Sequence, residues 1–575
     1  MNLLRTSSQK RLFRSVIVYF LTFCMFFNAS LPVVLAGPDG AQVVNGNVSI
    51  QQSGYNTTIT ASDKAIINYS SFDISRPEIV QFIQPDTSAS VLNRILSANP
   101  TNINGTLLAN GRVFFVNPAG VYFGNGAKVN VNQLVASALN ITDADFINGR
   151  YNFVGGEGSV INEGDIFAEK VYLIGRQVAN SGSISCPSGY VVMASGDRVF
   201  LGEPGSDIVL EIEGPSLPES ADPIEGSGVL NEGTVEAAGG TIVLAAAGDI
   251  YSQAISNVGS LSVSNDAGNA GEIKLTAVDG DVINTGTIKA SGSEGGQIAM
   301  EGTRVGQFGT VQADGTDSHG GSVDLTASEV VALSSDSLTT ANAGLNGDGG
   351  DVTVFSPDTA LFWPDALIEV KGGTLSGNGG FAEVSGREHV EIFGLVNATA
   401  VNGESGSLLI DPYDVTISTN ADAFPPAWPG TPFTPTGSGS NINTGTLNTQ
   451  LGLSSITITT VNGGGFEHGD ITVSNQIDLD GGKDNTLTLQ AEDDIIINAQ
   501  ILDTDLGTPD AVNITLTALD GNPGDGPSVD IGQSIDTYGG NFTSSGTTFD
   551  NTGGIISTNG GDIAINHSGL VTLGA

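Results

Sequence analysis

The stretch VINEGDIFA, residues 160–168, contains the pattern that decides the fold. Two apolar residues lead into an Asn, a Gly turn follows, and a short alternating segment closes the phrase. The same phrase returns at residues 178–184, 229–237, 255–261 and 282–290. Its Asn stands at positions 162, 180, 231, 257 and 284, with gaps of 18, 51, 26 and 27 residues, and the gap of 51 fits two periods. A period of about 20–50 residues indicates a stacked repeat architecture.

A second phrase, Gly-Gly followed by an alternating strand, lies between the copies. It occurs at residues 239–245, 295–300, 320–326 and 349–354. Strands this short cannot bury a face alone and must stack on copies of themselves, which predicts an all-β parallel β-helix. The repeated Asn predicts a hydrogen-bonded ladder along the stack. A propeller or a sandwich is the competing architecture, although both favour longer strands.

The amino-acid composition favours strands over helices and argues against two classes of binding partner. The chain has 575 residues, of which 79 are Gly and only 14% are charged. The formal charge of −43, from 19 basic and 62 acidic residues, argues against nucleic acid and against an anionic membrane surface. Solubility of a secreted chain explains the acidity, with calcium binding as the alternative. Residues 347–351 and 524–526 resemble acidic calcium turns but lack tandem repeats, so we expect no metal and no cofactor.

The N-terminus is typical of a secretory signal. Four basic residues precede an apolar run over residues 15–27, which is too short for a comfortable membrane span. Small side chains at Val34 and Ala36 predict a signal peptide over residues 1–36 with cleavage between Ala36 and Gly37; an uncleaved anchor is the alternative. Cys24 lies in this segment, so Cys186 is alone in the mature chain and no intrachain disulfide can form.

Residues 91–137 form an Asn- and Gly-rich stretch with two Asn-Pro pairs, Asn99-Pro100 and Asn117-Pro118. Each pair predicts a turn between short strands. The segments NRIL (93–96) and NPAGVYFG (117–124) resemble the signature of the haemagglutination-activity, or two-partner-secretion, domain of filamentous-haemagglutinin-like proteins. Ala119 stands where that family commonly has Asn.

The resemblance implies a capped, right-handed parallel β-helix that an outer-membrane barrel transporter recognises and exports unfolded. It also implies a secretion motif, for which the candidate residues are Asn93, Arg94, Asn117, Pro118, Gly120, Phe123 and Gly124. The alternative is that these residues only form turns of the β-helix.

The predicted organisation has five parts. They are the signal peptide (1–36), the two-partner-secretion domain (37–210), a β-helical repeat region (211–420), a Pro/Gly/Thr-rich linker (421–445) and a second β-rich repeat region (446–575). Residues 570–575 have the pattern of the middle of a rung, which indicates either a fragment or an end that something else covers.

The predicted function is adhesion by a secreted surface protein of a Gram-negative-type bacterium. Its partners would be the barrel transporter and a carbohydrate or protein on a host or neighbouring cell. A polysaccharide-degrading β-helical enzyme and the N-terminal part of a toxin-delivery exoprotein are the alternatives. The four His are isolated from one another, and Asp493 and Asp494 would face opposite sides of a strand, so we expect no catalytic residues.

Overall fold

A computed structural model describes residues 37–202, 210–214, 224–248, 250–420, 439–461, 469–481, 484–504, 510–519 and 526–574. The predicted signal peptide lies outside these ranges, and so does most of the predicted linker. Of residues 421–445, residues 421–438 are outside the described part, residues 440–443 form β42 (Ser440–Asn443), and Thr444 begins a helix.

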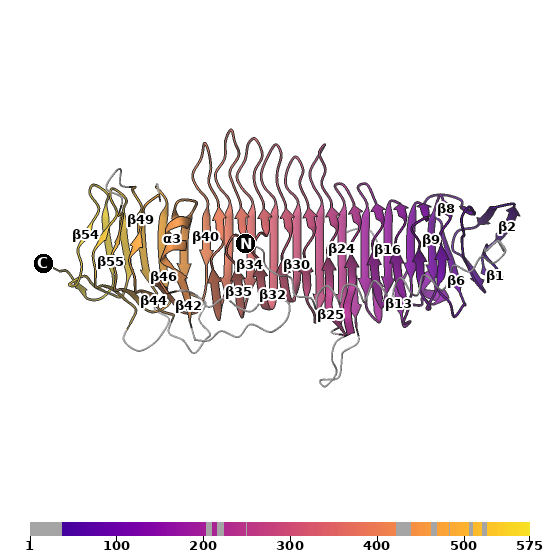
Figure 1. The fold of residues 1–575 in the computed structure, drawn as a ribbon, viewed down its shortest axis with the longest axis horizontal. Helices are drawn as coiled ribbons and strands as arrows, with labels where there is room; N and C mark the ends of the chain where they lie inside the picture. The colour runs from indigo at the N-terminus through magenta and orange to yellow at the C-terminus, as the bar shows by residue number, and fades with distance from the viewer. Residues whose placement is uncertain are drawn as a thin grey trace, which may run out of the picture.

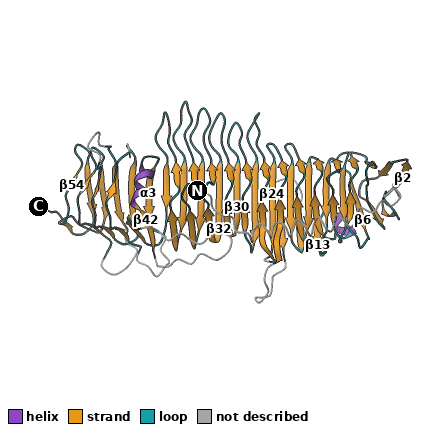
Figure 2. Ribbon diagram, in the orientation of Figure 1, coloured by secondary structure: helices purple, strands orange, loops and turns teal. Residues whose placement is uncertain are grey.

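The described chain is an elongated stack of parallel strands, with the first strands at one end and the last strands at the other (Figure 1). Each rung contributes three strands, as in β25 (Tyr251–Asn257), β26 (Ser260–Ser262) and β27 (Glu272–Val278), followed by β28 (Val282–Asn284), β29 (Thr287–Lys289) and β30 (Gln297–Gln307). Strand β25 pairs in parallel with β28, β26 with β29, and β27 with β30. The predicted parallel β-helix is therefore confirmed, and the chain is strand-rich almost throughout (Figure 2).

Alternation along each strand builds the core. In β27, Ile273, Leu275 and Ala277 point inward and are buried, while the residues between them face outward. Ile273 stacks in register between Ile242 and Ile298 of the neighbouring rungs. Burying a side chain of this size stabilises a fold by about 1.5–3 kcal/mol, so the stacked rungs stabilise one another.

The repeated Asn residues form a continuous ladder inside the rod. Each side chain donates its Nδ2 to the carbonyl oxygen of the next: Asn162 to Asn180, Asn180 to Asn231, Asn231 to Asn257 and Asn257 to Asn284 at 2.8 Å, and Asn284 to Gln307 at 2.7 Å. The ends are also satisfied, because Asn162 accepts the Gly164 N–H and Gln307 donates to the Gly309 carbonyl. All six side chains are buried, and the predicted ladder is confirmed.

Antiparallel strands cap the N-terminal end. Strand β1 (Gln42–Asn45) runs antiparallel to β4 (Ala65–Tyr69), and β2 (Val48–Ser53) forms a hairpin with β3 (Asn56–Ala61). Beneath this cap the first rungs are filled by aromatic rings, with Phe72 packed edge-on against Tyr69 and Phe115. The cap closes the end of the stack that no preceding rung could cover.

A second small core lies outside the β-helix. Helix α2 (Asp143–Ile147) and a three-stranded antiparallel sheet of β13 (Tyr151–Val154), β20 (Arg198–Leu201) and β21 (Leu210–Glu213) cover one outer face of the first rungs. Phe114 from the β-helix meets Phe146 of α2 at 5.2 Å between ring centroids. We call this segment the side cover.

Long loops project from one side of the middle rungs (Figure 1). The second Gly of each Gly-Gly phrase closes the base of its loop by donating its N–H to the residue where the loop begins. The pairs are Gly296 with Ala290, Gly321 with Ala313, Gly350 with Ala341 and Gly380 with Val370, at 2.7–2.8 Å. Gly406, which follows Ser405 instead of a Gly, makes the same bond to Ala398 at 2.7 Å. The first Gly of the phrase packs directly against the backbone of the next rung. A Cβ added to Gly320, for example, would lie 2.0 Å from the Ala341 carbonyl oxygen. The Gly-Gly phrase is thus a loop base with no room for side chains.

Helix α3 (Thr444–Leu451) interrupts one sheet of the rod. This sheet runs to β39 (Leu395–Asn397) and resumes, beyond α3, with β45 (Ile477–Asp478). The Gln450 side chain takes the place of the missing strand: its Oε1 accepts the Val396 N–H at 2.8 Å and its Nε2 donates to the Val396 carbonyl at 2.6 Å. No helix in the described part of the chain is long and apolar enough to cross a membrane.

Candidate secretion site

The two segments that carry the predicted motif lie on neighbouring strands. Asn93 and Arg94 belong to β6 (Ser90–Ile95), and Asn117 directly follows β9 (Arg112–Val116). The two strands pair in parallel, with Arg94 opposite Val116, the residue before Asn117. The fold therefore brings the two halves of the motif to one corner of the β-helix.

Arg94 joins this corner to the side cover. Its Nη1 lies 2.6 Å from Oδ1 of Asp143, and its Nη2 donates to the Ile141 carbonyl at 2.8 Å. The Arg94 side chain is only 14% exposed, while the Asp143 side chain is 44% exposed, so the ion pair lies at the edge of the buried region. Asp143 lies at the start of α2, whose Thr142 cap accepts the Asp145 N–H at 3.0 Å. Arg94 is thus a clamp between the β-helix and α2.

Asn93 points the other way, into the core. It stacks between Ile67 and Phe115 and is fully buried. Its Nδ2 donates to the Phe114 carbonyl at 3.1 Å, while its Oδ1 has no hydrogen-bond partner within the described chain. An unsatisfied buried carbonyl costs about 1–3 kcal/mol, so stability alone does not account for an Asn at this position.

Asn117 holds the two Asn-Pro turns together. Its Nδ2 donates to the Asn99 carbonyl at 3.0 Å and to Thr101 Oγ1 at 3.1 Å, and its Oδ1 accepts the Ala119 N–H at 3.0 Å. The side chain is fully buried. The predicted turn after Asn117 is present, because the Gly120 N–H donates to the Asn117 carbonyl at 2.8 Å.

Gly120 cannot be replaced without strain. Its φ is +119°, in a region that L side chains rarely adopt, and an added Cβ would lie 2.9 Å from the Ser159 carbonyl oxygen. Pro118 is half-buried beside it. The turn depends on the backbone of Gly120 and on the Asn117 amide, whereas Ala119, which departs from the family pattern, contributes only its N–H.

Phe123 and Gly124 lie across the next corner. Phe123 ends β10 (Val121–Phe123), is fully buried, and stacks between Ile103 and Asn162, so it covers the first step of the Asn ladder. Gly124 donates its N–H to the Ile103 carbonyl at 2.9 Å. These two residues belong to the core and a turn, and neither reaches the Arg94 clamp.

The partners of the motif residues escaped sequence reasoning. No sequence pattern links Arg94 to Asp143 or to the Ile141 carbonyl. None links Asn117 to Thr101 either. One sequence feature pointed to these partners. Thr142 followed by the acidic Asp143 and Asp145 is typical of a helix N-terminus, and an Arg can pair with such a carboxylate. The structure forms α2 over this segment.

Within the described part of the chain, the His and Cys side chains lie apart from one another. His319, His389 and His567 lie on separate rungs, where His319 accepts the Asp348 N–H, His389 contacts Glu391 and His567 contacts Ser544. Burial raises the pKa of Cys186 to about 12, as for a small apolar residue rather than a nucleophile. Within the described residues, no group of three or more His, Cys, Asp or Glu could hold a metal ion.

Comparisons with known proteins point to the same region. The profile of the TPS secretion domain matches residues 35–290, which contain every residue of the candidate motif. A heme/hemopexin-binding protein of Haemophilus influenzae is 33% identical over 224 residues, covering 37% of this chain and 24% of that protein. A second heme/hemopexin-binding protein of that organism is 36% identical over 118 residues, covering 20% of this chain and 13% of that protein. The chain thus matches about a quarter or less of these relatives.

A solved structure is similar over its whole length. The crystal structure of the HMW1 secretion domain from Haemophilus influenzae superposes with a TM-score of 0.50 and 28% sequence identity, covering 64% of this chain and 100% of that one. The similarity therefore extends beyond short motifs to the fold.

Proposed function

Residues 35–290 of this chain belong to the TPS secretion domain family, and on that premise we propose that an outer-membrane barrel transporter recognises this domain and that the following rungs form a stalk for adhesion. The chain is a two-partner-secreted exoprotein of the Gram-negative type, and its destination is the cell surface or the medium. The match to the TPS domain is the observation that carries the proposal. The named relatives are a secretion domain and heme/hemopexin-binding proteins, and none is an enzyme.

The physical properties of the chain support export in an unfolded state. Cys186 is the sole Cys after the predicted signal peptide, so no disulfide stands in the way of an extended chain. Each rung pairs with the rung before it, and a rung that has left the transporter can therefore add to the existing stack. The antiparallel cap at the N-terminal end closes the stack on the side where folding would start.

The Arg94 corner is the proposed secretion motif. Arg94 and Asn117 hold the side cover and the Asn-Pro turns in one arrangement, and both are largely buried. We therefore assign Asn93, Arg94, Asn117, Pro118, Gly120, Phe123 and Gly124 a role in shaping the first rungs for export, rather than direct contact with a ligand. Cleavage between Ala36 and Gly37 remains a prediction, as do the domain boundaries.

The proposal is tested by secretion in a Gram-negative host with and without the partner barrel. We expect the wild-type chain in the medium only when the barrel is present, and Asn117→Ala/Pro118→Ala retained in the periplasm. Wild-type chain that stays soluble in the periplasm beside the barrel would overturn the secretion proposal. Adhesion is tested separately, by comparing the adherence of cells that secrete the chain with cells that lack it.

A further inference from the structure

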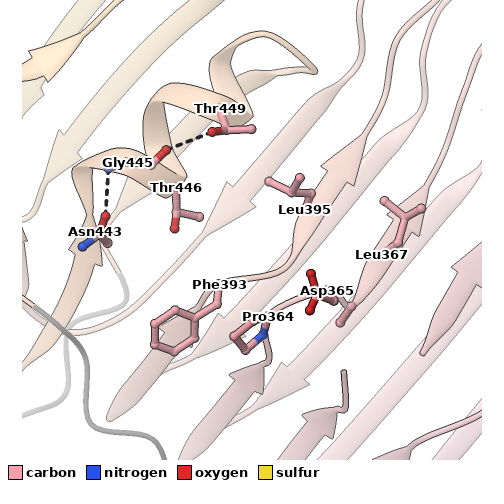
Figure 3. A pocket seen from close by; sticks show the side chains of 10 residues that line it. Pro364, Asp365, Leu367, Phe393, Leu395, Asn443, Gly445, Thr446 and Thr449 are labelled. Atoms are coloured by element: carbon pink, nitrogen blue, oxygen red, sulfur yellow. Dashed lines mark hydrogen bonds between the residues drawn. The ribbon is translucent and has the colours of Figure 1, made fainter. Parts of the chain in front are cut away.

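The place where α3 interrupts the rod is also a groove. On one side lie the turn at Pro364–Ala366 and the residue Phe393, and on the other side lies α3 (Figure 3). The groove has a volume of about 590 Å³, within the size range of small-molecule sites. It exists because a helix occupies the position where a further strand would have continued the flat outer face of the sheet.

One wall of the groove is apolar and the other is polar. Leu367 and Leu395 stack in register on β36 (Leu367–Glu369) and β39, and Phe393 adds a ring beside them. Across from these residues, Thr446 and Thr449 of α3 line the groove, as Figure 3 shows. The groove is therefore amphipathic along its length.

Two polar side chains in the groove have no internal hydrogen bond. Thr449 uses its hydroxyl to donate to the Gly445 carbonyl at 3.0 Å. In contrast, no residue of the described chain hydrogen-bonds the Asp365 carboxylate or the Thr446 hydroxyl. Asp365 is exposed, so its carboxylate and the Thr446 hydroxyl are available to a ligand.

We propose that this groove binds a neutral saccharide. A pyranose ring has an apolar face of C–H groups and a rim of hydroxyls, which match the Leu367 and Leu395 side chains and the Asp365 and Thr446 groups respectively. Among the described residues, Asp365 is the one charged residue that lines the groove, and the chain carries a net charge of −43, so sialylated and uronate sugars are repelled. The proposal rests on the adhesive role proposed above and gives that role a ligand class.

Binding is tested with the full secreted chain on an array of neutral oligosaccharides ending in galactose, mannose or N-acetylglucosamine, beside their sialylated counterparts. The variants are Asp365→Gly and Thr446→Val. Asp365 has a φ of +67°, which Gly adopts readily, so Asp365→Gly removes the carboxylate without disturbing the turn. The matched control is Asp336→Gly, since Asp336 has a φ of +68° in the corresponding turn one rung earlier and does not line the groove.

We expect neutral glycans to bind the wild-type chain and the Asp336→Gly control equally, and each groove variant to lose at least 10-fold of the signal. Equal binding by the groove variants, preferential binding of sialylated glycans, or no binding to the array would overturn the proposal. Cell adherence separates the two ideas: adherence that persists in both groove variants overturns the groove alone, whereas a wild-type chain that confers no adherence overturns the adhesive role.

Discussion

Asn257 donates its side-chain amide to Asn284 at 2.8 Å and accepts the amide of Asn231 at the same distance, with all three side chains fully buried. Each Asn is therefore donor and acceptor in a chain of hydrogen bonds that runs parallel to the axis of the rod. In a low-dielectric interior such bonds strengthen one another, and a break leaves polar groups unsatisfied on both sides.

Asn257→Ala breaks the ladder in its middle. We expect a loss of roughly 2–4 kcal/mol, from the unpaired Asn284 carbonyl, the weakened bonding of Asn231 and the cavity. Hydrogen exchange should show the loss as faster exchange in the rungs around residue 257. Asn269→Ala, at an exposed site in a projecting loop, should stay within about 0.5 kcal/mol of wild type. Unchanged exchange near residue 257 would mean that the ladder adds no stability.

Arg94→Ala should loosen the side cover. The change leaves the Asp143 carboxylate and the Ile141 carbonyl without their partner, at an expected cost of about 2–3 kcal/mol. Limited proteolysis should then cut within residues 139–154 faster than in wild type. The control is Arg150→Ala, because Arg150 is 65% exposed and its 3.3 Å pair with Asp145 lies at the surface. Equal cutting in both variants would contradict the clamp.

Gln450→Leu should weaken the junction between β39 and α3. Both bonds from Gln450 to Val396 are lost, so the edge of β39 loses its partner, at roughly 2–4 kcal/mol. Hydrogen exchange at Val396 reports the change directly. Asn448→Ala removes one acceptor, for the Asp478 N–H at 3.1 Å, and should leave Val396 as protected as in wild type. If Val396 stays protected in Gln450→Leu, the side chain does not substitute for a strand.

Asp530→Asn should stabilise the C-terminal rungs at neutral pH. Partial burial, and then Asp550 and Asp494, raise the pKa of Asp530. Ionisation of this group therefore opposes folding as the pH rises above about 4, and the effect is absent where the carboxyl is protonated in both states. We expect a gain of roughly a few tenths of a kcal/mol at pH 7, because solvent screens the repulsion, and no gain near pH 2.5.

The control for this pH dependence is the neighbouring carboxyl. Hydrogen bonds from Thr552 lower the pKa of Asp550, so its ionised form favours folding above the ordinary Asp pKa. Asp550→Asn should therefore lower the melting temperature at pH 7, and this loss should shrink as the pH falls below the ordinary Asp pKa. The measurement is thermal unfolding of both variants at the two pH values. If Asp530→Asn lowers the melting temperature at pH 7, the ionised Asp530 carboxylate does not oppose folding.

The repeats could be predicted because their information is local and periodic. The spacing of Asn231, Asn257 and Asn284 predicts which residues stack, and the structure pairs Asn231 with Asn257 and Asn257 with Asn284. The side cover escaped prediction because β13 pairs with β20, a strand some fifty residues away that carries no copy of the repeat. Helix α3 escaped for another reason: TGTLNTQL has no marked apolar face, and its position depends on one Gln side chain that pairs with a distant strand.

The candidate motif was predicted in part. A turn could be predicted from Asn117, Pro118 and Gly120, because these residue types favour turns. The structure has a turn there. Arg94 gives no such hint, because its partners come from a segment nearly fifty residues further along the chain that reaches it only in the folded state.

Because each projecting loop is closed at its base by a hydrogen bond, the length of a loop can change without changing how the rungs stack. A loop can range from residues 291–295 to residues 371–379 between the same kind of base, and the rungs above and below remain in register. Insertions at the loop tips would therefore broaden the molecule without moving anything beyond them, while each added rung would carry the distal end about 4.8 Å further from the first. In such a protein, reach and surface chemistry can evolve independently.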